Sequence, residues 1–220
     1  KVFDVSPFMV NKPWNAVGWT PVSLYPFAIG LGFLLPADLL FSCWFFYFYW
    51  KAQRVISSMY GWSDYNASFP YVNEQSFGAY MGIAVLALWG ARHHLSRVIE
   101  QAFSRAPDPE PDQPFSYRTA VIGVVAGLTI LMGFFYAAGL PLWMCAAGFA
   151  IYYLIAIACT RMRAELGPPA HDLHNGGPDY ILTAVFGTRG FTPQTLGVLT
   201  FFYWFNRAYR SLAMPCQLEA

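Results

Sequence analysis

Long apolar runs without a charged side chain are the feature that most restricts how this chain can fold. Residues of the set AVILMFWYC make up 56% of the sequence, and charged residues make up only 11%. Soluble domains carry about 25% charged residues, which cover the surface that meets water. A chain with so few charges lacks that cover. We therefore expect an integral membrane protein whose principal partner is the lipid bilayer.

The first apolar stretch runs from about residue 22 to residue 50 and is interrupted by Pro26, Pro36 and Asp38. As one helix it would be about 43 Å long, which exceeds the ~30 Å hydrocarbon core of a bilayer. The stretch is either one long tilted helix kinked at Pro36 or two half-helices that meet there. Its aromatic end, followed by Lys51 and Arg54, is typical of a bilayer surface.

Three further apolar stretches follow a polar loop that we place at Ser57–Gln75. The second span is predicted at residues 77–91, with a polar helical continuation to Pro107. The third and fourth, at 119–138 and 142–160, are predicted to form an antiparallel hairpin around a tight turn at Gly139. Small residues would let the two backbones of this hairpin approach closely: Gly123, Gly127, Gly133, Ala146, Ala147 and Gly148.

Two shorter helices are predicted near the end of the chain. An amphipathic helix fits residues 178–186, and a last helix begins with Thr192 as its N-cap and Pro193 in its first turn. The last helix is short for a span. Together the segments predict an all-α polytopic transmembrane helix bundle with about four full spans and one or two partial or broken helices. We expect residues 1–220 to form a single transmembrane domain, part of a larger membrane protein.

The positive charges are distributed unevenly between the two predicted sides of the bundle. Only Lys51 and Arg54 fall on one side. The other side receives Lys1, Lys12, Arg92, Arg97, Arg105, Arg118, Arg161 and Arg163. Because cytoplasmic loops are rich in Lys and Arg, we place the N-terminus in the cytoplasm and the chain in the cell inner membrane. The net charge of +1 and the lack of a basic run argue against a nucleic-acid partner.

Several motifs carry a resemblance to a known group of proteins. The longest is the run from Arg161 to His174 (RMRAELGPPAHDLH), and residues 35–38, 201–207 and 214–219 fit the same pattern. The chain resembles uncharacterised bacterial multi-pass membrane proteins that are known only as a domain of unknown function. Those proteins are typically longer, so the resemblance implies that this chain is a fragment. It implies no activity.

Asp38 is the most informative single residue. A carboxylate deep in an apolar segment costs about 2.5–3.5 kcal/mol on insertion scales, so it usually has a partner or a function. Pro36 beside it suits the broken helices of transporter binding sites. The alternative is that Asp38 lies in the first turn of a second half-helix, where the helix dipole favours a negative charge. We expect Asp38 to face protein or water, with Asn206 or Arg207 as its neighbour.

The second candidate region is a cytoplasmic charge cluster made of Arg161, Arg163, Glu165 and Asp172. We expect an arginine there to pair with Glu165, Asp172 or Asp179. His171 and His174 are weak metal candidates, because Gly167, Pro168 and Pro169 oppose the helix that would align them. We expect no bound metal and no other cofactor. The adjacent His93 and His94 diverge on a helix, and the cysteines form neither a disulfide framework nor a zinc spacing.

These residues support three hypotheses of different classes. The first is a small-solute transporter with Asp38, Asn206 and Arg207 along the path. The second is a non-catalytic structural subunit that packs against other membrane subunits. The third is a membrane-embedded enzyme, which only the His171 region supports. No catalytic motif is visible, so we expect that the chain is not an enzyme.

Overall fold

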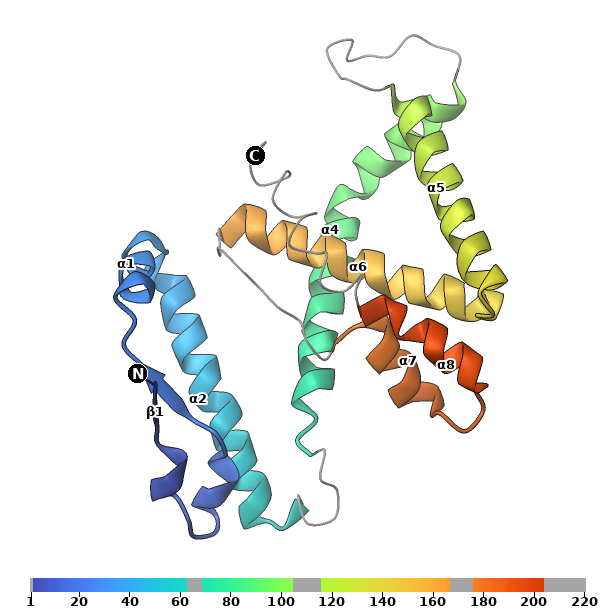
Figure 1. The fold of residues 1–220 in the computed structure, drawn as a ribbon. Coiled ribbons are helices and arrows are strands. Elements are labelled where there is room, and N and C mark those ends of the chain that lie inside the picture. Colours follow the sequence, from blue (N-terminus) through green and yellow to red (C-terminus); the bar gives the residue numbers. More distant parts are fainter. Residues whose placement is uncertain (1, 63–68, 105–115, 167–175, 204–220) are drawn as a thin grey trace. The chain divides into compact units, whose positions relative to one another are not determined.

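The computed structural model describes residues 2–62, 69–104, 116–166 and 176–203. Helices dominate these ranges, which agrees with the predicted all-α class (Figure 1). The chain divides into two compact units. One contains Lys1–Ser76 with Glu165–Pro168, and the other contains Phe77–Ala164 with Pro169–Ala220.

The first unit begins with a small antiparallel ribbon that the apolar pattern did not predict. Strand β1 (Val2–Asp4) pairs with β2 (Pro21–Ser23), and two 3-10 turns, η1 (Ser6–Phe8) and η2 (Trp14–Val17), lie between them. The Asp4 carboxylate accepts hydrogen bonds from the backbone N–H groups of Ser6 at 3.0 Å and Thr20 at 3.2 Å. Strands of three residues are too short to show an alternating pattern, so periodicity could not predict them.

The long apolar stretch forms two helices rather than one kinked helix. Helix α1 (Pro26–Leu34) ends before Leu35, whose backbone is extended at φ −89° and ψ 147°. Helix α2 (Ala37–Met59) begins after Pro36, which occupies its N-cap position (Figure 1). Pro36 lacks an N–H group and disfavours the helical conformation of the residue before it. The structure therefore selects two separate helices from the two alternatives.

Lys51 fixes α2 to the N-terminal segment. Its side chain is only 5% exposed. Its Nζ donates hydrogen bonds to the carbonyl oxygens of Val17 at 2.9 Å and Trp19 at 2.8 Å. It also lies 4.6 Å from the Trp50 ring centroid. The sequence predicted only a position at a bilayer surface for Lys51. It did not predict these contacts, because it does not show that the N-terminal segment folds back onto α2.

Helix α4 (Val72–Phe103) is continuous over 32 residues. This confirms that the helical pattern continues beyond the predicted span at 77–91. The predicted loop at Ser57–Gln75 is wrong at both ends, since α2 continues to Met59 and α4 begins at Val72. The side-chain amide of Gln75 donates to the carbonyl oxygen of Pro70 at 2.6 Å, next to the start of the helix.

Two helices in the described part of the chain are long and apolar enough to cross a membrane, not about four. They are α5 (Tyr117–Ala137) and the segment Leu142–Glu165 of α6 (Leu142–Leu166). Helix α1 has nine residues and is too short. Helices α2 and α4 contain apolar runs, but charged and polar residues interrupt them, as at Asp38, Lys51 and Arg92. The predicted span count is therefore wrong, although α5 and α6 were predicted as spans.

The predicted tight turn between α5 and α6 is confirmed at Gly139. Its φ of +106° belongs to the left-handed region that favours glycine. Helix α8 (Pro193–Leu199) holds this turn from outside. Gln194 Nε2 donates to the carbonyl oxygen of Ala138 at 3.0 Å, and Thr195 Oγ1 donates to that of Gly139 at 3.3 Å.

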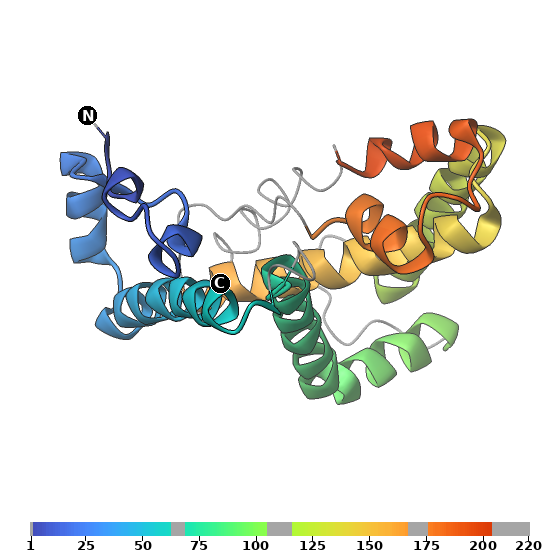
Figure 2. The same cartoon turned by 90° about the horizontal axis from the view of Figure 1, so that it is seen from below.

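The close backbone packing predicted for α5 and α6 is not found. A Cβ atom added at Gly123, Gly127 or Gly133 would meet nothing within 4 Å. The two helices diverge from the turn, and they share a buried core only near it (Figures 1 and 2). In α6, Gly148 does allow a close approach, but the group that approaches is the Phe202 ring at 2.8 Å from the added Cβ.

The predicted helix at residues 178–186 is confirmed as α7 (Pro178–Phe186). The predicted start of the last helix is also confirmed, since the Thr192 side chain accepts a hydrogen bond from the Thr195 N–H at 3.2 Å. Both helices pack on α6. The buried residues of this core are Phe135, Leu140, Met144, Cys145, Phe149, Leu182, Val198, Leu199 and Phe202.

Candidate functional site

Asp38 lies in the first turn of α2, directly after the break at Leu35 and Pro36. Its side chain is exposed. This is the position of the first-turn alternative, in which the helix dipole favours a negative charge. One turn further, Ser42 lies on the same face of the helix. The break thus presents a carboxylate and a hydroxyl on one face of the apolar first half of α2.

The predicted neighbours of Asp38, Asn206 and Arg207, lie outside the described residues. His171, Asp172 and His174 lie outside them too, so the structure does not test the cluster that they were predicted to join. Arg161, Arg163 and Glu165 occupy the last turns of α6, where Arg163 is buried and the other two are exposed. A cation in the last turn of a helix is favoured by the helix dipole.

No group of three or more His, Cys, Asp or Glu side chains able to hold a metal ion occurs among the residues that the structure describes. His93 and His94 are exposed on α4. The His94 ring lies edge-on to the Tyr117 ring, with 6.4 Å between centroids. His94 thus contacts the first residue of α5.

A pocket of about 390 Å³ lies between α7 and the C-terminal part of α8. The sequence did not predict this pocket, and we expected Asp179 only as an ion-pair partner of an arginine. The pocket is lined by Asp179, Tyr180 and Thr183 from α7 and by Leu196, Leu199, Thr200 and Tyr203 from α8 and the residues after it. The Gly177-Pro178-Asp179 start of α7 was visible in the sequence, but the pairing of α7 with α8 was not.

The carboxyl group of Asp179 is the chemically distinctive part of this pocket. Its Oδ1 atom is buried and has no hydrogen-bond partner among the described residues. Burial raises the pKa of the Asp179 carboxyl, and the backbone N–H groups of Tyr180 and Asp179 oppose the rise. An ionised carboxylate in such a place gains from a cationic partner.

The hydroxyl groups of two threonines in the pocket donate hydrogen bonds to backbone carbonyl oxygens. Thr183 Oγ1 donates to the carbonyl oxygens of Asp179 at 2.8 Å and Tyr180 at 2.9 Å. Thr200 Oγ1 donates to the carbonyl oxygen of Gly197 at 2.7 Å. Each hydroxyl group can therefore still accept a hydrogen bond, but its O–H donor is already in use.

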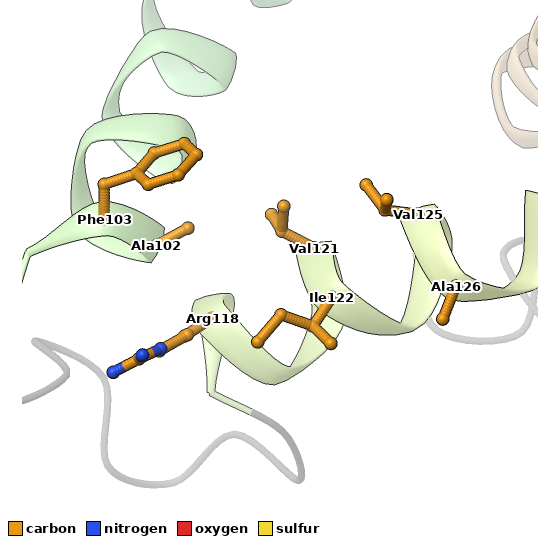
Figure 3. A pocket seen from close by; sticks show the side chains of 7 residues that line it. All are labelled: Ala102, Phe103, Arg118, Val121, Ile122, Val125 and Ala126. Atoms are coloured by element: carbon orange, nitrogen blue, oxygen red, sulfur yellow. The ribbon is translucent and has the colours of Figure 1, made fainter. Parts of the chain in front are cut away.

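A second pocket, of about 470 Å³, lies between the end of α4 and the start of α5. Ala102 and Phe103 from α4 face Val121 and Val125 from α5, as Figure 3 shows. Among the described residues of the lining, Arg118 alone is charged, and its side chain points away from this gap (Figure 3). The walls are hydrocarbon, so this pocket suits an apolar group.

No curated protein and no solved structure matches the chain. A family model does match it, over residues 1–220. The resemblance to a domain of unknown function is confirmed at that level. The chain belongs to the Family of unknown function (DUF6785).

Proposed function

We propose that this chain is an integral membrane protein that transports a small solute. The observation that carries the proposal is the break between α1 and α2, with Asp38 in the first turn after it. In many transporters, helices broken near the bilayer midplane form the solute site, because the ends of the half-helices leave backbone groups and a dipole free to bind it. The carboxylate would add a charge to such a site.

The exposed apolar surface of α5 supports the membrane location. Its 21 residues are apolar enough to span, and only 6% of its most apolar window is buried. Val124, Val125 and Ile130 are all more than half exposed. Monomeric soluble proteins rarely expose such a continuous apolar surface to water, whereas lipid tails cover it at no cost.

The path of the solute is proposed to contain Asp38, Asn206 and Arg207. A carboxylate at membrane depth needs a polar or cationic neighbour, and the segment after α8 supplies both types close together in the sequence. We place the chain in the cell inner membrane with its arginine-rich side in the cytoplasm. The N-terminus and the ends of α5 and α6 that carry Arg118 and Arg161 would then lie on the cytoplasmic side.

Replacement of Asp38 by Asn tests the proposal. Asn stabilises the start of a helix about as well as Asp, so the fold should survive. If Asp38 binds the solute or a coupling ion, uptake of a panel of labelled small solutes into proteoliposomes should fall to the level of empty liposomes. If Asp38 acts only on the helix dipole, Asp38→Asn should transport as the native chain does. Glu100→Gln, which removes one exposed carboxylate from α4, is the matched control.

A second candidate function is that of a structural subunit in a larger membrane assembly. The exposed aromatic residues of α2 favour it, since Phe41, Trp44 and Phe46 are each about 60% exposed. Aromatic residues are enriched at interfaces between proteins. The mass of the protein after mild extraction from its native membrane separates the two functions. A mass much larger than that of the chain in its detergent micelle supports the subunit.

A further inference from the structure

The pocket between α7 and α8 combines a carboxyl group that has one unsatisfied oxygen with further hydrogen-bond acceptors. Asp179 supplies the carboxylate, and its Oδ1 is buried without a partner among the described residues. Thr183 and Thr200 supply hydroxyl oxygens that can accept hydrogen bonds, because their O–H groups already donate to backbone carbonyl oxygens. A ligand that complements these groups must carry a positive charge or donate hydrogen bonds.

The remaining walls of the pocket are aromatic and aliphatic. The side chains of Tyr180 and Tyr203 line it together with those of Leu196 and Leu199. A ring face attracts a cation, and leucine side chains contact methyl and methylene groups. The volume of about 390 Å³ exceeds the room that a bare ion needs. It is sufficient for a small organic molecule, since one water occupies only about 30 Å³.

We propose that this pocket binds a small organic compound through a primary ammonium group held by Asp179. The three N–H donors of the ammonium would be shared between the Asp179 carboxylate and the oxygens of Thr183 and Thr200, and the carbon chain would lie against the leucines. The inference goes beyond the transport proposal, because the pocket is built from other elements than the α1–α2 break and binding there can be measured without flux.

Two features of the described residues favour an ammonium ligand over a metal ion. The lining contains one carboxylate, no histidine and no cysteine. A divalent metal ion usually takes several such ligands. The apolar part of the lining would also be left without a function if the ligand were an inorganic ion.

Thermal unfolding of the purified chain in detergent tests the proposal with three probes at equal ionic strength: propylammonium chloride, tetramethylammonium chloride and sodium chloride. A ligand that binds only the folded state raises Tm, by a few degrees when its concentration is about ten times Kd. We expect propylammonium to raise Tm above the value in sodium chloride. Tetramethylammonium should do so less, because it has no N–H group to donate.

Asp179→Asn should remove the propylammonium effect, and Glu100→Gln, which removes an exposed carboxylate elsewhere, should keep it. Thr200→Val retains the carboxylate and takes away one acceptor, so the affinity should fall on the order of fivefold. This variant keeps the proposal testable if Asp179→Asn does not fold.

Three results would overturn the proposal. The first is an equal Tm in propylammonium and sodium chloride at every concentration. The second is a propylammonium effect on Tm that persists unchanged in Asp179→Asn or in Thr200→Val. A stronger effect of tetramethylammonium than of propylammonium would also contradict it, because the threonine oxygens would then have no role.

Discussion

The ring of Phe202 lies so close to Gly148 that a Cβ atom added at Gly148 would be 2.8 Å from the Phe202 Cζ atom. Phe202 is fully buried, and its ring centroid lies 5.0 Å from that of Phe135 and 5.2 Å from that of Phe149. The segment after α8 thus reaches the core of α5 and α6 through one aromatic ring, and Gly148 provides the space for it.

We predict that Gly148→Ala destabilises the chain by about 1–3 kcal/mol, the usual effect of an extra methyl group in a filled core. Thermal unfolding in detergent measures it. Gly127→Ala is the matched control, because nothing lies within 4 Å of its added Cβ and alanine favours a helix. Phe202→Leu in the Gly148→Ala background should restore part of the loss. Equal Tm values for the two single variants would show that the ring does not occupy this place.

Lys51→Met is predicted to detach the N-terminal segment from α2. The change removes the donor of the hydrogen bonds to Val17 and Trp19, and each bond from a charged donor is worth about 1.5–3 kcal/mol. Faster protease cleavage before residue 25 is the expected result. Gln53→Met, on the same helix, loses only an exposed contact of 3.4 Å to Gln75 and should be cleaved at the native rate. Native-like resistance of Lys51→Met would contradict the anchoring role.

The raised pKa of Asp179 gives a third prediction, about pH. A carboxyl whose pKa is higher in the folded state than its ordinary value of 3.8 binds protons more tightly when folded. Its ionisation therefore removes stability as pH rises from about 4 through the raised pKa. In ammonium-free buffer, Tm of Asp179→Asn minus Tm of the native chain should be largest near pH 7. It should shrink as the pH falls toward 4.

Added propylammonium should narrow the difference in Tm near pH 7, where the carboxylate is ionised, and have little effect near pH 4. A difference in Tm that does not vary with pH would show that the environment of Asp179 leaves its protonation unchanged.

Local sequence signals predicted the elements whose ends depend on a single residue type. Pro36 marked the break, Gly139 marked the turn, and Thr192 with Pro193 marked the start of α8, all in agreement with the structure. The span count failed because apolar runs alone do not show how charged residues such as Lys51 are used. The α7–α8 pocket depends on contacts between segments distant in the sequence. Periodicity carries no information about such contacts.

Membrane topology gives a fourth prediction. Cysteines placed within residues 57–75 should react with impermeant reagents on intact cells, and cysteines placed within 106–114 should react only after the membrane is opened. Cys43 is exposed and must first be replaced, as must Cys216, whereas Cys145 and Cys159 are buried. The opposite labelling pattern would mean that the charge distribution does not orient this chain.

Transport through the α1–α2 break requires that the face of α2 with Asp38 borders water at membrane depth. A nitroxide spin label at Ser42, one turn beyond Asp38 on the same face, reports this directly in a lipid bilayer. Leu40, on the opposite face, is the matched position. We expect a water-soluble nickel complex to relax the label at Ser42 more than oxygen does, and oxygen to dominate the relaxation at Leu40. Oxygen-dominated relaxation at both positions would place Asp38 toward the acyl chains and contradict transport through this break.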